Sequence, residues 1–266
     1  GSYFINNRTS IANLSNDLTG NMYRYQGSAS TVTNNYICFG TSTKSTCTGN
    51  PGTYMYRIIG IDTSGRIKII KKEALDTALQ WSTYTNQWAS ASLFTNLNGS
   101  TFLNNTTFVP SGWSSKIETY TWHYGTQNQV LNQPGTTIYN YELGSNAYFT
   151  STVSGKISIM YMHDYYLALD NTTSCGYGGT TYPNCKAGWM HISQNDSSPP
   201  SVAEWTMSAS PSQINNNNTA WYIGEGGSCS NTNVAYDESV RPVFFLTAST
   251  GIISVTGTIS DPYIIG

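Results

Sequence analysis

The most constraining feature of the sequence is a pair of apolar runs joined by a short turn. Residues 54–61 read YMYRIIGI and residues 66–70 read RIKII, and both are rich in the β-branched and aromatic side chains that strands favour. The residues between them read DTSG, a turn in which Gly65 is free to adopt a positive φ. The pattern predicts a β-hairpin, so the fold must contain an antiparallel pair of strands at this point.

The remaining apolar segments predict short elements. Residues 92–98 have apolar side chains at helical spacing and are followed by Gly99, which predicts a short helix. Residues 113–122 predict a second helix, because Trp113, Ile117 and Tyr120 would share one face. Strands are predicted for residues 155–162, 240–246, 251–255 and 262–265. Residues 1–32 are polar with a weak helical pattern at Ile11, Leu14 and Leu18, so we expect an N-terminal segment at 1–32 and a domain at 33–266.

Charge is scarce in this chain and excludes one class of function. Only 10% of the residues are charged and the net charge is -2, whereas about 25% of residues are charged in a typical soluble domain. A nucleic-acid-binding protein needs a basic patch that neutralises phosphates, and the chain has none. Its densest basic group, Lys68, Lys71 and Lys72, is interpreted as a solvated strand end. We therefore expect no nucleic-acid partner, and contact with a membrane only through an anchor outside this chain.

Four of the five cysteines form two closely spaced pairs. Cys38 and Cys47 flank a polar loop, and Cys175 and Cys185 flank another. Each pair could close its loop as a disulfide, and neither has the spacing or the histidine partners of a zinc site. Disulfides are favoured over free thiols and indicate an extracellular location. Cys229 is left over and is expected to be unpaired.

Five motifs, taken in their order along the chain, carry a resemblance to a known family. They are residues 56–61, 88–103, 204–208, 239–246 and 257–265. Together they resemble an uncharacterised family of surface proteins from Gram-positive gut bacteria, whose domains have a C-type-lectin-like fold related to that of formylglycine-generating enzymes. The resemblance implies an α+β fold of short twisted antiparallel sheets, two or three short helices and long ordered loops.

The resemblance also implies binding rather than catalysis. In related folds the ligand residues lie just before the last buried strands, which corresponds here to the loops at 215–236. The residues that would contact a glycan or protein on a host or bacterial surface are Trp221, Tyr222, Glu225, Asn231, Asn233 and Tyr236. The expected function is extracellular recognition or adhesion at the cell surface. The alternative is a structural subunit of a pilus or surface filament, and a secreted hydrolase is the third choice.

Catalytic and metal-binding interpretations are weaker. His163 and Asp164 are adjacent, so on a strand they would point to opposite faces, and a structural role for His163 is expected. Calcium could be held by Asp237 and Glu238 near Asn231 and Asn233, but a solvated turn is the preferred interpretation. We therefore expect no catalytic residues, no metal and no cofactor.

Two further expectations concern buried side chains. Arg241 lies within a predicted buried strand, so it needs a carboxylate or carbonyl partner, and Glu204 is the carboxylate proposed for it. Four tryptophans are expected to be core anchors: Trp81, Trp113, Trp189 and Trp205. For the filament alternative, an isopeptide bond between a lysine and an asparagine is conceivable, although a lysine on an edge strand explains Lys68 more simply.

Overall fold

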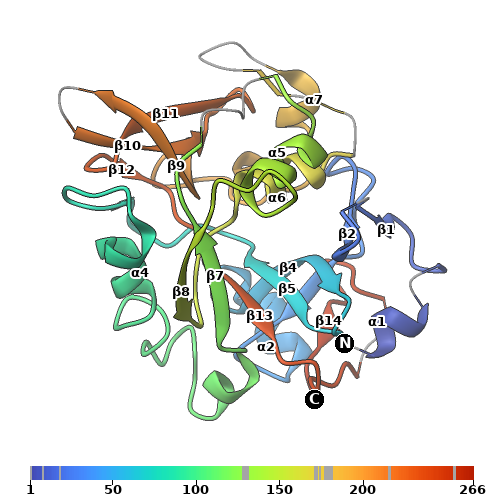
Figure 1. Cartoon of the computed structure of the whole chain (residues 1–266). Helices are drawn as coiled ribbons and strands as arrows, with labels where there is room; N and C mark the ends of the chain where they lie inside the picture. Colours follow the sequence, from blue (N-terminus) through green and yellow to red (C-terminus); the bar gives the residue numbers. More distant parts are fainter. Residues whose placement is uncertain are drawn as a thin grey trace.

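A computed structural model describes the chain apart from residues 1, 8, 18, 128–131, 171, 172, 174, 177–181, 215, 216, 254 and 255. Within the described residues, the largest sheet has seven strands. Five of them run in the order β1-β2-β4-β3-β14, β5 pairs with β4, and β13 pairs with β5 (Figure 1). Their bounds are β1 Leu14–Asn16, β2 Met22–Tyr25, β3 Tyr36–Cys38, β4 Met55–Asp62, β5 Ile67–Lys71, β13 Val243–Leu246 and β14 Tyr263–Ile264.

The predicted hairpin is confirmed and forms the centre of this sheet. β4 and β5 pair antiparallel from Tyr56↔Lys71 to Ile61↔Ile67, and Gly65 in the turn has a φ of 83°. β13 covers the other edge of β5, while β2 and β3 pair with different halves of β4. Every residue of both hairpin strands is buried. Burial on both faces explains why the two runs are continuously apolar instead of alternating.

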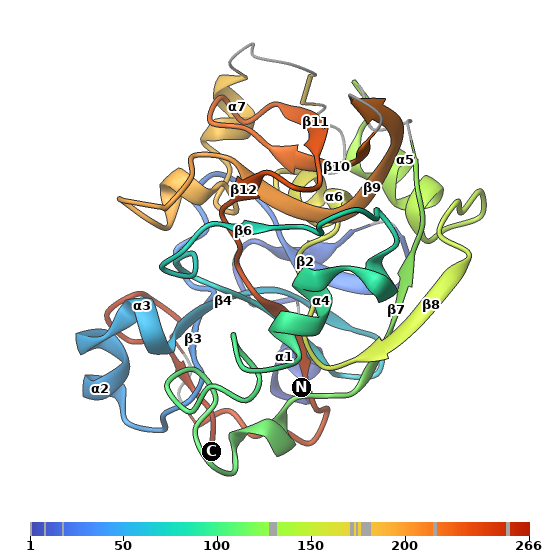
Figure 2. The same cartoon turned by 90° about the vertical axis from the view of Figure 1, so that its left-hand side faces the viewer.

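Three smaller sheets complete the strand content of the described residues. β9 (Glu204–Ile214), β10 (Asn217–Ile223) and β11 (Cys229–Asn233) form an antiparallel sheet in the order β11-β10-β9. This sheet lies above the central sheet in Figures 1 and 2. β7 (Tyr120–Tyr124) pairs with β8 (Ser151–Gly155), and β6 (Leu79–Gln80) pairs with β12 (Asp237–Glu238).

The helices are short, and together with the sheets they make the protein α+β, as expected. The α-helices are α1 Ser2–Asn7, α2 Lys44–Gly49, α3 Pro51–Tyr54, α4 Ser92–Leu97, α5 Gly135–Glu142, α6 Met162–Leu167 and α7 Pro183–Lys186. The 3-10 helices are η1 Trp88–Ser90, η2 Trp113–Lys116 and η3 Ile192–Gln194. α4 confirms the helix predicted at 92–98. α5 and α6 lie side by side above the central sheet and next to the upper sheet (Figure 1).

Two predicted elements are wrong. Residues 113–122 form a 3-10 turn followed by strand β7, because the aromatic positions fit the two-residue period of a strand as well as the helical period. Trp122 is buried in that strand and donates from Nε1 to the Gly155 carbonyl at 2.9 Å. Residues 155–162 do not form one strand, since β8 ends at Gly155 and α6 begins at Met162. An apolar run indicates that its residues are buried, but it does not determine whether the backbone forms a strand or a helix.

The N-terminal segment at 1–32 contributes to the central sheet. β2 pairs with β4 through Met22↔Asp62 and Arg24↔Gly60, so the N-terminal segment supplies strands to the central sheet. Phe4 in α1 packs its ring 5.0 Å from that of Tyr263 in β14. The helical pattern at Ile11 and Leu14 is not realised, since Leu14 begins β1, and Leu18 lies outside the described residues.

The tryptophans and cysteines largely follow expectation. Trp81, Trp189 and Trp205 are buried core residues, whereas Trp113 is only half-buried at the edge of the core. Both expected disulfides, Cys38–Cys47 and Cys175–Cys185, are present and are consistent with an extracellular protein. Cys229 is free and buried, and burial raises the pKa of its thiol to about 11.

Candidate functional site

A cleft of about 250 Å³ borders the central sheet on the side of α5 and α6. β2, β5, β7 and β13 contribute side chains to it, as do the turn after β4, the helix α5 and the first turn of α6. The cleft combines aromatic rings with an unusual number of charged groups for a chain that has so few.

A buried chain of charges forms the floor. Arg24 on β2 donates from Nε to Asp17 Oδ2 and from Nη1 to Asp164 Oδ1, each at 2.7 Å. Lys68 on β5 donates from Nζ to Asp164 Oδ2 at 2.6 Å. All four side chains are almost completely removed from solvent. The interpretation of Lys68 as a residue of a solvated strand end is therefore wrong, and so is the edge-strand interpretation, since β5 is paired on both sides.

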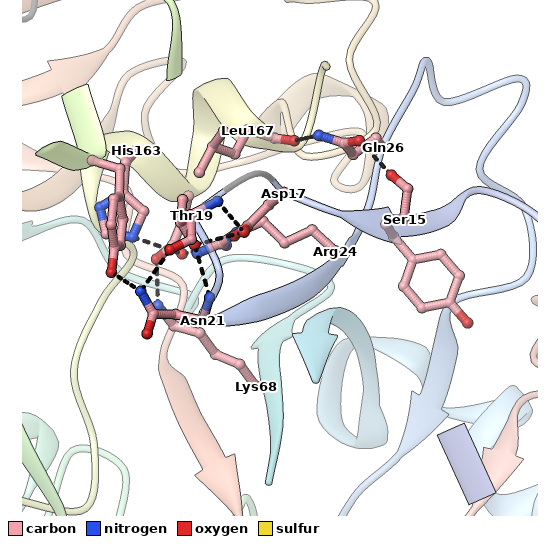
Figure 3. Close-up of polar contacts among 12 residues, drawn as sticks. Ser15, Asp17, Thr19, Asn21, Arg24, Gln26, Lys68, His163 and Leu167 are labelled. Atoms are coloured by element: carbon pink, nitrogen blue, oxygen red, sulfur yellow. Dashed lines mark hydrogen bonds and ion pairs between the residues drawn. The ribbon is translucent and has the colours of Figure 1, made fainter. Parts of the chain in front are cut away.

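Local structure positions the two carboxylates. Asp164 lies in the first turn of α6, where its Oδ2 accepts the Tyr161 backbone N–H at 2.9 Å and a negative charge is favourable. Asp17 follows β1, and its Oδ1 accepts from the backbone N–H and the hydroxyl of Thr19 (Figure 3). Both carboxylates are therefore held by hydrogen bonds within their own segments as well as by the cations.

The buried charges shift one another's pKa values. Burial alone would raise the pKa of the Asp164 carboxyl, but Lys68 and Arg24 outweigh it, and that pKa lies well below its ordinary value. Burial lowers the pKa of the Lys68 ammonium, an effect that Asp164 only partly offsets. The pKa of Arg24 is raised, because its two carboxylate partners outweigh its burial. Asp164 is thus an ionised carboxylate held between two cations.

A second buried pair lies beside this chain. His163 Nδ1 is 2.6 Å from Glu142 Oε2, and Glu142 Oε1 accepts the Ser208 hydroxyl. The imidazole stacks on the Tyr161 ring with centroids 4.9 Å apart and meets the edge of Tyr139 at 5.1 Å. His163 Nε2 lies 3.6 Å from Asp164 Oδ1. His163 and Asp164 lie in a helical turn instead of the expected strand, so the two side chains approach each other.

The outer wall of the cleft is aromatic and cationic. Arg66 donates from Nε to Asp62 Oδ2 at 2.7 Å, and its guanidinium lies over the Tyr120 ring, 5.0 Å from the centroid. Tyr120 stacks in turn on Phe245, with centroids 4.3 Å apart. On the opposite side, the hydroxyl of Tyr139 accepts from the side-chain amide of Asn21, which is exposed (Figure 3).

The residues predicted to bind ligand do not form one exposed patch. Trp221 is 2% exposed and donates from Nε1 to the Gln127 carbonyl at 2.9 Å, so its predicted exposure is wrong. Asn233 is also buried, with its Oδ1 accepting from the Ala235 backbone N–H at 2.9 Å. The physical reason is that β10 and β11 are paired strands of a sheet, in which side chains alternate between the core and the outer face. Residues Asn215 and Asn216 of the predicted loops lie outside the described residues.

The other four predicted contacts remain at or near the surface. Tyr222 and Asn231 are half-buried, Glu225 is exposed, and Tyr236 is 55% exposed. Tyr222 packs edge-to-face on Trp205, with centroids 6.3 Å apart. These residues lie on the upper sheet and its turns, away from the residues that line the cleft.

Sequence reasoning missed the charged floor of the cleft. One signal was available for Lys68, which interrupts an otherwise apolar strand between Ile67 and Ile69. A charge inside such a run requires a buried partner, the same reasoning that predicted a partner for Arg241. The partner could not be identified, because Asp164 is 96 residues away.

A histidine holds the turn between β10 and β11. His191 Nε2 donates to the Gly224 carbonyl at 3.1 Å while its Nδ1 accepts the Ser193 backbone N–H at 3.2 Å. Both contacts suit the neutral imidazole, because a protonated Nδ1 can no longer accept. Burial lowers the pKa of His191 to about 4 from an ordinary 6.5.

We therefore predict that acidification destabilises the protein through His191. The unfolded chain binds a proton at this residue below pH 6.5, and the folded chain does so only near pH 4. The stabilisation is complete above pH 6.5 and is lost as the pH falls to 4, by up to about 3 kcal/mol. Urea unfolding from pH 7 to pH 4 should show this loss, and the slope should be shallower in His191→Gln. An equal slope in the two proteins would contradict the prediction.

Comparison of the chain with protein-family models, with curated proteins and with solved structures finds no match.

Across the described residues, no group of three or more His, Cys, Asp and Glu side chains is arranged so that it could hold a metal ion. At the predicted calcium position, Asp237 is exposed and Glu238 Oε2 accepts from the Ser201 hydroxyl at 2.6 Å. Among the residues that the structure describes, no helix is long and apolar enough to cross a membrane.

Proposed function

We propose that the protein is an extracellular recognition domain that binds an acidic sugar unit of a surface glycan in the cleft. The observation that carries the proposal is the lining of the cleft, where Arg24 and Arg66 border a space walled by aromatic rings. Its volume of about 250 Å³ is close to the lower end of the roughly 300–1,000 Å³ typical of small-ligand pockets. A single sugar ring is a ligand of suitable size.

The distribution of charge favours a negative ligand group. Arg24 and Arg66 border the cleft, and the lining carboxylate Asp62 is paired with Arg66, whereas Asp17 and Asp164 are fully buried. Arg24 is bound to both buried carboxylates through Nε and Nη1 and is itself almost completely buried, so Arg66 is the more open of the two guanidinium groups. A carboxylate in the cleft would meet the Arg66 guanidinium, a group that binds carboxylates with particular geometric fit.

The aromatic walls support a sugar as the carrier of that carboxylate. The rings of Tyr120, Tyr139 and Tyr161 border the same space, and apolar C–H faces of sugars pack on such rings. Asn21, Thr63 and His123 are exposed at the rim, where they can reach sugar hydroxyls. The proposal thus moves the ligand site from the loops at 215–236 to the cleft, and it retains a C-type-lectin-like scaffold at the cell surface.

Replacing Arg66 tests the cleft directly. Hydrogen bonds to charged groups contribute about 1.5–3 kcal/mol, so Arg66→Ala should weaken binding of a glucuronide about tenfold to a hundredfold. Isothermal titration with methyl glucuronide and methyl glucoside should show a preference for the acid that falls as salt is added. Lys44→Ala is the control, because Lys44 is an exposed lysine of α2.

Two outcomes would contradict the cleft as the binding site. One is equal affinity for the acidic and neutral sugars, and the other is unchanged affinity in Arg66→Ala. Thermal unfolding of each variant separates a binding defect from a folding defect, since Arg66 also pairs with Asp62 beside the hairpin turn.

The proposed role is binding without catalysis. Asp164 is engaged in buried ion pairs, Glu142 is hydrogen-bonded to His163 and to the Ser208 hydroxyl, and the ring of His163 is packed against two tyrosines. The filament alternative stays a prediction. Burial of Trp221 within its own chain accounts for that side chain without a neighbouring subunit, and analytical ultracentrifugation of the purified protein would test for assembly.

A further inference from the structure

Lys68 and Asp164 meet in a buried contact between elements that are far apart in the sequence. The Lys68 ammonium lies 2.6 Å from Asp164 Oδ2, and the two residues are 96 positions apart. Lys68, labelled in Figure 3, is on β5 between β4 and β13, and Asp164 is in the first turn of α6. An amine and a carboxyl group held in contact are the reactants of an amide bond. We infer that Lys68 and Asp164 become joined by an intramolecular isopeptide bond.

The surroundings of Lys68 favour this reaction over simple ion pairing in water. Its Nζ lies 5.0 Å from the ring centroid of Tyr161, 5.6 Å from that of Phe245 and 5.9 Å from that of Trp122. These rings exclude water, which lowers the pKa of the ammonium and makes the neutral amine, the nucleophilic form, more accessible. Fixed contact replaces a bimolecular encounter, an advantage equivalent to an effective concentration of about 10⁵–10⁸ M in well-oriented cases.

The atoms and charges of the reaction balance within the pair. One proton moves from Lys68 Nζ to Asp164 Oδ2 across their hydrogen bond, which gives a neutral amine and a neutral acid. The Nζ lone pair attacks Asp164 Cγ, the Cγ–Oδ2 bond breaks, and a second proton of the amine leaves with Oδ2 as water. No oxidant, metal or activated ester is required, and the cleft that borders both Lys68 and His163 gives the water a way out.

The groups around Asp164 have opposing effects on this step. Arg24 stabilises the carboxylate, so the reaction proceeds from the small neutral population and is slow. Arg24 also donates to Oδ1, the oxygen that remains, and a donor there stabilises the negative charge that develops as the amine attacks. His163 Nε2, 3.6 Å from the same oxygen, is placed to assist. We expect a maturation step over hours rather than an instantaneous reaction.

The other lysine contacts of the described residues differ from this one. Lys71, the other buried lysine of β5, donates from Nζ to the backbone carbonyls of Gly52 and Glu73. Lys72 pairs with a partly exposed Glu73, and Lys44 pairs with Asp261 at the surface. Only Lys68 combines a fully buried carboxylate with an aromatic enclosure, so Lys71 provides a control on the same strand.

The mass of the protein tests the inference. The full chain, stored for several days and then reduced and denatured, should weigh one water molecule less than its sequence requires. Trypsin should fail to cut after Lys68, and tandem mass spectrometry should find residues 67–71 attached to residues 157–186. A mass equal to that of the sequence, with free peptides ending at Lys68, would overturn the inference whatever the variants show.

Two variants locate the bond. Lys68→Arg keeps a cation beside Asp164 but should retain the full sequence mass, whereas Lys71→Met should still lose one water. Loss of water in Lys68→Arg would place the modification elsewhere and would also refute the assignment. The wild-type peptide analysis does not depend on either variant folding.

Discussion

Arg241→Ala should lower the free energy of unfolding by about 3–5 kcal/mol, because it leaves a buried carboxylate without its partner. Arg241 forms a bidentate contact with Glu204, in which Nε and Nη2 each donate to one carboxylate oxygen at 2.7 Å. Both residues are 1% exposed. Burial raises the pKa of Glu204, an effect that Arg241 opposes, so removal of the arginine leaves the carboxyl group with the cost of burial alone.

The same arginine joins three segments of the chain. Glu204 begins β9, Arg241 precedes β13, and Nη2 of Arg241 also donates to the Met190 carbonyl. Loss of this residue therefore loosens the junction between the central sheet and the upper sheet as well as one ion pair. Arg241→Lys should recover only part of the stability lost in Arg241→Ala, because an ammonium group cannot reproduce the planar bidentate contact.

Urea unfolding followed by tryptophan fluorescence measures this effect. Lys44→Ala, which breaks the exposed Lys44–Asp261 pair, is the control and should leave the unfolding midpoint nearly unchanged. A loss of less than about 1 kcal/mol in Arg241→Ala would mean that Glu204 finds another partner or becomes protonated at little cost.

Trp221→Ala should be comparably destabilising, by about 3–5 kcal/mol, because it opens a large cavity in the core. Trp221 is 2% exposed and its indole nitrogen is hydrogen-bonded to the Gln127 carbonyl, so the substitution also leaves that carbonyl without its donor. Tyr236→Ala provides the contrast. Its side chain is 55% exposed, and surface substitutions usually change stability by no more than about 0.5 kcal/mol.

The two variants also separate the cleft from the loops as a ligand site. At a temperature where Trp221→Ala is fully folded, it should bind methyl glucuronide as the wild-type protein does, because Trp221 does not border the cleft. Tyr236→Ala should bind normally as well. If Tyr236→Ala loses binding while its melting temperature is unchanged, the exposed face near Tyr236 is the ligand surface and the cleft is not.

Local patterns predicted the elements whose signals are complete within a few residues. The hairpin of β4 and β5 has two apolar runs and a turn glycine, and α4 has helical spacing ended by Gly99. The two disulfides each close a short loop, and Cys229 was correctly left unpaired. In each case the information that decides the structure lies close together in the chain.

The prediction was wrong where the spacing of apolar residues fits both the helical period and the two-residue period of a strand. The aromatic residues at 113–122 suit a helix and a strand equally, and pairing of β7 with β8 decides for the strand. Trp221 was placed at the surface because its neighbours are polar. In the structure Trp221 is buried together with its neighbours Thr219 and Ala220, so the polar residues around the strand did not indicate exposure of the strand itself.

The buried charges show which features could be predicted from the sequence and which depend on the tertiary structure. The sequence predicted a carboxylate or carbonyl partner for Arg241, with Glu204 as a candidate, because a charge in a buried strand is too costly without one. The same reasoning applies to Lys68, but that residue was interpreted as a solvated strand end and its partner was missed. The hairpin and the loop disulfides follow from side chains that act on near neighbours, so the sequence by itself determined them. The cleft, its charged floor and the contact of Lys68 with Asp164 follow from contacts across 96 residues. Only the packing of α6 against the central sheet brings those groups together, and no local pattern encodes a distance of that kind.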